Sequence, residues 1–210
     1  ATITPYTLAL SGISVPDRVY DATTVGTVAG APTVTPLPGD DVAVSGTGIA
    51  IFDSKNVGEA RPVTISGFTL TGVDAPNYSL LLPSSLSAST APRPIAPTGI
   101  RAVDRVADNS STVQLNTSQA ALPGVLPGDV VSLVLNTPFG LVDSPTPGVA
   151  KPVTLVGFSL SGVDAPNYSL NLRPVAGGPG VVAGSEVSVT LNPNLRQRFV
   201  QEARSAGSLQ

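Results

Sequence analysis

The sequence predicts an all-β protein that contains two tandem small domains. Three observations lead to this prediction. Apolar and polar residues alternate over short stretches, turn-forming residues separate these stretches, and one long stretch of sequence occurs twice. Alternation with a period of two is the mark of a half-buried strand, and several short strands between turn signals indicate a sandwich or a barrel.

The alternating stretches define the expected strands. In "DVAVS", Val42 and Val44 face one side, and "IAIF" at Ile49–Phe52 is a further short strand. The other inward positions are Val63, Ile65, Phe68, Leu70, Tyr78, Leu80 and Leu82, with Val153, Leu155, Phe158, Leu160, Tyr168, Leu170 and Leu172 in the second copy. Pro-Gly-Asp stretches between these strands predict turns. Pro and Gly favour turn conformations, and the Asp side chain can accept hydrogen bonds from nearby backbone N–H groups.

An Ig-like sandwich is the favoured architecture for each copy, because short strands recur at regular spacing. A β-grasp-like sheet is the alternative. It requires a short helix, for which Ser118–Leu126 ("SQAALPGVL") is the candidate segment.

The repeated stretch predicts the domain organisation. Arg61–Leu80 aligns with Lys151–Leu170 at an offset of 90 residues, and "DRV" at Asp17 recurs at Asp104 at an offset of 87. The order holds while the offset drifts, so one domain is written twice with different loop lengths. The expected boundaries are 1–83 for the first repeat, 84–94 for a linker, 95–174 for the second repeat and 175–210 for a C-terminal tail.

The two ends of the chain carry further expectations. The tail contains an alternating stretch at Glu186–Leu191 and a helix-like composition over Asn194–Gln210, so a short strand and a helix are expected there. Ala1–Pro5 aligns with Ala88–Pro92 at the same offset of 87. We therefore expect the chain to begin inside a repeat and to be a segment of a longer, elongated array.

Composition narrows the function. His, Cys, Met and Trp are absent, so imidazole acid–base chemistry, thiol nucleophiles and zinc–thiolate sites are excluded. The net charge of −3 and the scarcity of lysine argue against nucleic-acid binding, and no apolar run is long enough to insert into a membrane. We expect no enzyme, no cofactor and no metal site. A chain without Cys tolerates export through an oxidising compartment.

The nine residues "GVDAPNYSL" occur at Gly72–Leu80 and again at Gly162–Leu170. Pro76 fixes its own φ, and Asn77 tolerates a left-handed conformation, so the stretch predicts a tight turn between two strands. Asp74 is expected to accept backbone N–H bonds across the same corner, and the Tyr78 ring to be buried with a partner for its hydroxyl. A Ca²⁺ or sugar site is the alternative, but Asp74 and Asn77 offer two oxygens where Ca²⁺ takes six to eight.

The candidate site residues are structural, and none is assigned a catalytic, cofactor-binding or metal-binding role. They belong to the start motif, the Gly-Asp turns and the two corners. In chain order they are Tyr20, Asp21, Gly39, Asp40, Asp74, Asn77, Tyr78, Gly128, Asp129, Asp164, Asn167 and Tyr168.

Three stretches read together resemble the YDG repeat. They are "DRVYDATT" from Asp17, "GDDV" from Gly39 and "FDSKNVGEARPVTISGFTLTGVDAPNYSL" from Phe52. The first repeat departs from the family pattern at Ala22, where the family usually has Gly. The second departs more: Ala107 replaces the motif Tyr, and "DSPTPGVAKPV" replaces "DSKNVGEARPV".

The resemblance implies a context. YDG domains and the related MBG domains occur in tandem in large bacterial surface adhesins, many of them filamentous-haemagglutinin-like exoproteins of two-partner secretion. A secreted or cell-surface location follows as an expectation. The implied role is a non-enzymatic stalk or spacer, with adhesion or biofilm matrix contact. The implied partners are neighbouring repeats and host-cell or matrix glycans or proteins.

The alternative function is a carbohydrate- or matrix-binding module with its own ligand site. Such a site needs exposed aromatic rings, for which Tyr6, Tyr20 and Phe139 are the candidates. The two functions make different demands on the structure. Buried tyrosines at 20, 78 and 168 favour a scaffold, whereas a row of exposed tyrosines favours sugar binding.

Overall fold

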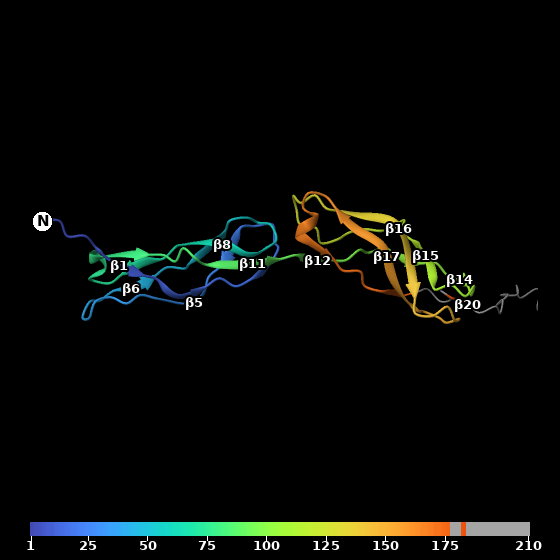
Figure 1. Cartoon of the computed structure of the whole chain (residues 1–210), viewed down its shortest axis with the longest axis horizontal. Coiled ribbons are helices and arrows are strands. Elements are labelled where there is room, and N and C mark those ends of the chain that lie inside the picture. The colour runs from blue at the N-terminus through green and yellow to red at the C-terminus, as the bar shows by residue number, and fades with distance from the viewer. Residues whose placement is uncertain (177–181, 184–210) are drawn as a thin grey trace, which may run out of the picture. The chain divides into compact units, whose positions relative to one another are not determined.

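The computed structural model describes residues 1–176 and 182–183. Figure 1 shows the strands of the chain. The contacts between residues divide the chain into two compact units. The first consists of Ala1–Gly99, Ser118–Thr137 and Gly157–Arg173, and the second of Ile100–Thr117, Pro138–Val156 and Pro174–Gln210. Each unit is described by itself below.

The prediction of an all-β fold is confirmed. The strands are β1 (Tyr6–Ala9), β2 (Ser11–Ser14), β3 (Arg18–Val19), β4 (Val25–Thr27), β5 (Ala29–Thr33), β6 (Ala43–Ser45), β7 (Ile49–Phe52), β8 (Gly58–Ser66), β9 (Thr69–Thr71), β10 (Tyr78–Leu81), β11 (Ser87–Ala91), β12 (Arg93–Ile95), β13 (Arg101–Ala102), β14 (Arg105–Val106), β15 (Thr112–Asn116), β16 (Ser132–Val142), β17 (Pro152–Ser161), β18 (Tyr168–Leu170), β19 (Val175–Ala176) and β20 (Val182–Ala183). Two single 3₁₀ turns, η1 (Ala75–Asn77) and η2 (Ala165–Asn167), are the helical elements of the described residues. In those residues, no helix has the length and apolar character needed to cross a membrane.

The first repeat is built on a five-stranded sheet in the order β3-β11-β8-β7-β4. Its central strands, β7 and β8, pair antiparallel, and their inward residues alternate as the sequence predicts. Phe52, Val63 and Ile65 are each at most 4% exposed and pack in one core cluster. Because every second side chain of a strand faces the same side, this cluster covers one face of the sheet.

The segment 84–94 differs from the expected linker. Its residues form β11, which pairs antiparallel with β8 and parallel with β3, and the start of β12, which pairs parallel with β18. Small polar residues suggested a linker, but Ala88 and Thr90 face inward and are 4% and 2% exposed. Thr90 can be buried because the Arg18 Nε donates to its hydroxyl at 3.3 Å. An almost continuous extended chain therefore runs from the first repeat into the second.

The second repeat forms a sheet in the order β13-β15-β16-β17-β19. In the second compact unit, Val113, Val142 and Val153 form its buried cluster. The candidate helix at Ser118–Leu126 is not formed: the segment consists of turns and one isolated bridge between Ala121 and Thr98. Pro123 and Gly124 explain this, since both residues disfavour a helix interior.

Three expectations from the sequence stay predictions. The choice between sandwich and β-grasp topology is not settled by the strand pairings. The domain boundaries 1–83 and 95–174 likewise stay as stated. The expected tail strand and tail helix lie outside the described residues.

A matched pair of substitutions tests the core of the first repeat. Ile65→Ala removes a side chain that is 4% exposed, so we expect the free energy of unfolding to fall by about 2–5 kcal/mol. Ile49→Ala, on the neighbouring strand, removes one that is 45% exposed and should cost at most about 1 kcal/mol. Urea unfolding followed by circular dichroism measures both, and equal losses would contradict the assignment of the core face.

Candidate functional site

The repeated corner is a single 3₁₀ turn between two strands. Pro76 and Pro166 occupy its first turn, and the Asn77 N–H donates to the Asp74 carbonyl at 3.0 Å. The expected left-handed Asn is not observed, because the 3₁₀ turn keeps Asn77 at negative φ. The positive φ falls instead on Gly72, at 116°, where an added Cβ would lie 2.1 Å from the Asp41 carbonyl oxygen.

The corner aspartate binds a distant loop and not its own turn. Asp74 Oδ2 accepts the N–H of Asp41 at 2.8 Å, and Asp164 Oδ2 accepts that of Val130 at 2.9 Å. In return the Asp74 N–H donates to the Asp41 carbonyl at 3.2 Å. The prediction that this carboxylate would accept across the same corner was wrong, and the carboxylate instead ties the corner to the Pro-Gly-Asp turn 33 residues earlier.

The corner tyrosine closes the same loop from the other side. The Tyr78 hydroxyl donates to Asp40 Oδ2 at 2.5 Å and accepts the Leu37 N–H at 3.1 Å, and Tyr78 is 8% exposed. Tyr168 repeats both bonds, with Asp129 at 2.7 Å and the Leu126 N–H at 2.9 Å. The prediction of a buried ring with a partner for its hydroxyl is confirmed in both copies.

The glycine before each of these aspartates is needed for the turn. Gly39 and Gly128 have φ of 96° and 88°, a conformation that residues with a Cβ rarely adopt. Each places its following aspartate, Asp40 or Asp129, under the corner tyrosine.

The start motif forms a second local turn. Asp21 Oδ1 accepts the Thr23 N–H at 2.9 Å and forms an ion pair with Arg18 at 3.2 Å. Ala22, between Asp21 and Thr23, has a φ of 66°. Its counterpart in the second repeat, Asn109, has a φ of 61°. A left-handed residue is required here, which accounts for the glycine that the resembled family usually has at this position.

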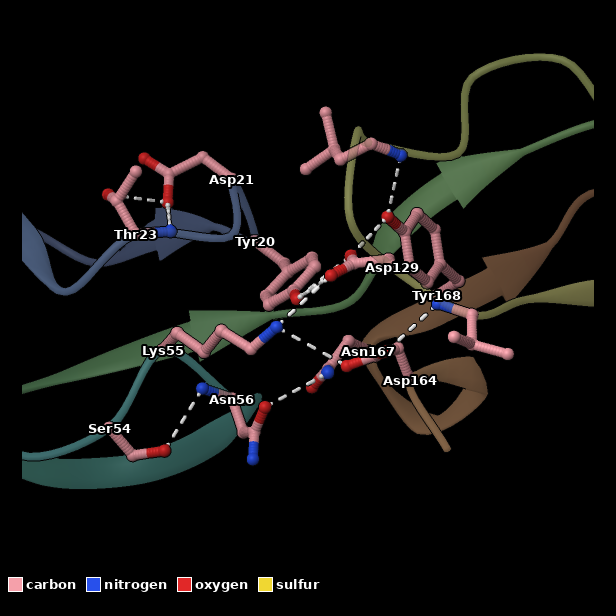
Figure 2. A network of polar contacts seen from close by, with 12 residues as sticks. Tyr20, Asp21, Thr23, Ser54, Lys55, Asn56, Asp129, Asp164, Asn167 and Tyr168 are labelled. Atoms are coloured by element: carbon pink, nitrogen blue, oxygen red, sulfur yellow. Dashed lines mark hydrogen bonds and ion pairs between the residues drawn. The ribbon is translucent and has the colours of Figure 1, made fainter. Parts of the chain in front are cut away.

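The structure brings five of the predicted residues together: Tyr20, Asp129, Asp164, Asn167 and Tyr168 (Figure 2). All lie within the first compact unit. Tyr20 does not pack on the corner tyrosine of its own repeat. Its ring meets that of Tyr168 edge to face, with centroids 5.5 Å apart, and its hydroxyl donates to Asp129 Oδ2 at 2.9 Å. The other predicted residues take part in the local turns described above and not in this group: Asp21, Gly39, Asp40, Asp74, Asn77, Tyr78 and Gly128.

Lys55 completes the network. Its Nζ lies 3.1 Å from Asp129 Oδ1 and 3.3 Å from Asp164 Oδ1, so one ammonium joins two carboxylates (Figure 2). Sequence reasoning did not assign Lys55 to this site, because a lone lysine in a turn resembles a solvated side chain. The feature of the sequence that could have pointed to Lys55 is the scarcity of lysine, since the chain has two lysines, Lys55 and Lys151.

Asn167 adds two further bonds next to the lysine. Its Oδ1 accepts the Val57 N–H at 3.0 Å, and its Nδ2 donates to Asn56 Oδ1 at 3.0 Å. The oxygen and the nitrogen of the side-chain amide are therefore both hydrogen-bonded, and Asn167 is 5% exposed. Residues 55–57 of the first repeat thus contact Asp129, Asp164 and Asn167 of the second repeat.

The electrostatics of the site follow from burial and pairing. The Asp129 side chain is 1% exposed. Burial alone would raise the pKa of Asp129, but hydrogen bonds from Tyr168, Lys55 and Tyr20 outweigh it, and the pKa lies below its ordinary value. The hydrogen bond to Asp129 raises the pKa of Lys55, while burial raises those of Tyr20 and Tyr168.

The arrangement joins two repeats. Three donors converge on one buried carboxylate, and the cation that Asp129 and Asp164 hold is the ammonium of Lys55. Among the described residues there is no group of three acidic side chains placed to hold a metal ion.

Comparison with known families gives one result. A family model described as the YDG domain matches the chain twice, over residues 4–88 and over residues 91–176. No curated protein and no solved structure matches the chain. The two matches meet within β11, the strand that leads from the first repeat toward the second.

The two corner asparagines provide a matched test of the network. Asn167→Ala leaves the buried Val57 N–H without its acceptor, so we expect the free energy of unfolding to fall by about 1–3 kcal/mol. Asn77→Ala changes the same residue of the same motif where it is exposed, and should change the stability by no more than about 0.5 kcal/mol. Urea unfolding measures both variants. Equal costs would mean that the contacts of Asn167 contribute nothing to stability.

A pH titration tests the charge balance at Asp129. Its folded pKa lies below the ordinary value near 3.8, so its contribution to stability is complete above that value and is lost as the pH falls through the folded pKa. Lys55→Met removes one donor and one positive charge, so the pKa of Asp129 should rise and the contribution should shrink. Carboxyl ¹³C NMR measures the pKa directly. Lys151→Met, which removes the partner of Asp143, is the control and should leave Asp129 unchanged.

Proposed function

Because this chain belongs to the YDG domain family, with one domain over residues 4–88 and a second over residues 91–176, we propose that it is a non-enzymatic stalk segment of a larger adhesin. The adhesin is bacterial and is secreted or exposed at the cell surface. The two domains act in it as a spacer between functional parts. The partners are neighbouring repeats, and host-cell or matrix glycans or proteins contact the adhesin in adhesion or in a biofilm.

One observation carries the proposal: the residues that characterise the family motif are used to join one domain to the next. Tyr20 of the start motif is fully buried against Tyr168 and Asp129. Lys55 joins two carboxylates of the second domain, and β11 leads into β12 with a single residue between them. A joint with a shared extended chain and a buried polar network suits a linear array, in which contacts between neighbouring domains add to the stability of each one.

The adhesin context rests on the resemblance to YDG and MBG repeats of filamentous-haemagglutinin-like exoproteins. The absence of Cys is in keeping with two-partner secretion, because no disulfide can form before the chain crosses the outer membrane. The burial of Tyr20, Tyr78 and Tyr168, at 0%, 8% and 6% exposure, supports a scaffold and not a row of sugar-binding rings.

A carbohydrate- or matrix-binding module is the second candidate, and two aromatic side chains favour it. The Tyr6 side chain is 55% exposed. Phe139 is half-buried and lines a cavity of about 600 Å³ in the second compact unit, together with Arg105 and Asp108. An aromatic ring beside charged side chains is a usual arrangement for binding a sugar.

A glycan array combined with a cell-adhesion assay on the purified chain separates the two candidates. A spacer predicts binding at background level for the wild type, and no difference between the wild type and the variants Tyr6→Ala and Phe139→Ala. A lectin on the same array serves as the positive control. Tight binding to one glycan that either variant abolishes would overturn the spacer and establish the binding module.

A further inference from the structure

The same corner lies in two different environments. Each corner keeps its internal hydrogen bonds, with the carboxylate–amide bond at 2.8 Å in the first repeat and 2.9 Å in the second. The surroundings differ. Asn77 is exposed, whereas Asn167 is 5% exposed. Leu37 is 49% exposed, whereas its counterpart Leu126 packs in the cluster that contains Tyr20.

The contacts made by the first repeat account for this difference. Tyr20, Lys55 and Asn56 lie against the corner of the second repeat in Figure 2, and the Val57 N–H donates to the same corner; we name these four residues of the first repeat the donor end. The donor end supplies one tyrosine hydroxyl, one ammonium and one backbone N–H. These three groups meet Asp129, Asp164 and the Oδ1 of Asn167.

The first repeat carries the corresponding corner residues. They are Leu37, Asp40, Asp74, Asn77 and Tyr78, at the positions of Leu126, Asp129, Asp164, Asn167 and Tyr168. Among the described residues, Asp40 accepts from Tyr78, Asp74 from Asp41, and neither carboxylate is paired with a lysine or an arginine. We name this surface the first corner.

The first corner is also more acidic than the occupied one. Asp41 stands where the second repeat has Val130, so the sequence at the first corner carries one more acidic residue than the sequence at the second. A surface of this charge favours a cationic occupant, because an ammonium relieves the repulsion between the carboxylates.

We propose that the first corner is a docking surface for the donor end of another YDG domain. The occupant carries a tyrosine, a lysine and a free backbone N–H at the positions that correspond to 20, 55 and 57 of this chain. In the sequence, Ala1 and Ile3 align with Ala88 and Thr90, the two inward residues of β11.

The second repeat does not offer such a donor end. The counterpart of Tyr20 is Ala107, which has no hydroxyl, and that of Lys55 is Pro145, which has no ammonium. The counterpart of Val57 is Pro147, which has no N–H to donate. The second repeat therefore cannot supply the occupant. The first corner accepts only a domain that has the tyrosine, the lysine and the backbone N–H found in the first repeat. The docking depends on these contacts and does not require the adhesin role.

A fusion tests the proposal. A further copy of residues 1–87 is placed directly before Ala1, so that the added Tyr20 and Lys55 precede the first corner at the natural spacing of 87 residues. In the 210-residue chain, Asn77→Ala should lower the equilibrium constant for folding less than about twofold. In the fusion the same substitution should lower it about tenfold, as we expect for Asn167→Ala, because the acceptor of a partly buried N–H is then lost.

The control removes the donor end without changing the length of the fusion. With Tyr20→Ala and Lys55→Met in the added copy alone, Asn77→Ala should again have less than about a twofold effect. A second fusion, in which Ala88–Pro92 replaces Ala1–Pro5, restores the natural β11 for the added copy and keeps the test available if the first fusion does not fold. An effect of Asn77→Ala that is the same in the folded fusion and in the single chain would overturn the proposal.

Discussion

The buried carboxylate of Asp129 is the interaction on which the junction depends. A carboxylate that is 1% exposed must be paired and hydrogen-bonded, because its transfer from water costs several kcal/mol. Here Tyr168 of its own corner, Tyr20 and Lys55 supply the donors. Tyr20 reaches it across 109 residues of sequence, which requires β3, the turn after β7 and the β11–β12 segment to be in place. Removal of any one donor leaves the buried charge less well compensated, so the elements that supply the three donors stabilise one another through Asp129.

The two motifs of the repeat therefore serve different purposes. The corner closes the fold of its own domain, since Asp74 and Tyr78 make the same internal bonds as Asp164 and Tyr168. The start-motif tyrosine serves the next domain. This division explains why the second repeat retains its corner and yet has Ala107 in place of the tyrosine. Ala107 packs against the Val113, Val142 and Val153 cluster, so at that position the chain contributes to its own core and makes no bond to a neighbour of the kind Tyr20 makes.

Much of this structure could be predicted from local patterns, and the junction could not. Alternation predicted the strands of the core, and the buried corner tyrosines followed from their place at the start of a strand. The partner of Tyr20 has no local signature, because 109 residues separate it from Asp129 and the chain contains another Gly-Asp turn closer to it. The strand β11 could not be told from a linker in the sequence, because its inward residues are small. The conformation of Asn77 was mistaken because a 3₁₀ turn and a left-handed turn share the same Pro-Asn signature.

A polar junction has a physical advantage over an apolar one in a protein that displays its repeats in series. An apolar docking surface that awaits its partner would be exposed, and contiguous exposed apolar patches promote association with the wrong partners. The first corner instead exposes carboxylates and an amide, which water solvates well. The bonds are also directional, so a tyrosine hydroxyl, an ammonium and a backbone N–H must arrive together and in register. A partner with proline at position 57 would leave the oxygen of Asn77 without a donor, and the mismatch would cost what a lost buried hydrogen bond costs. The carboxylates and the amide that water solvates in the free corner are thus the same groups that select its partner.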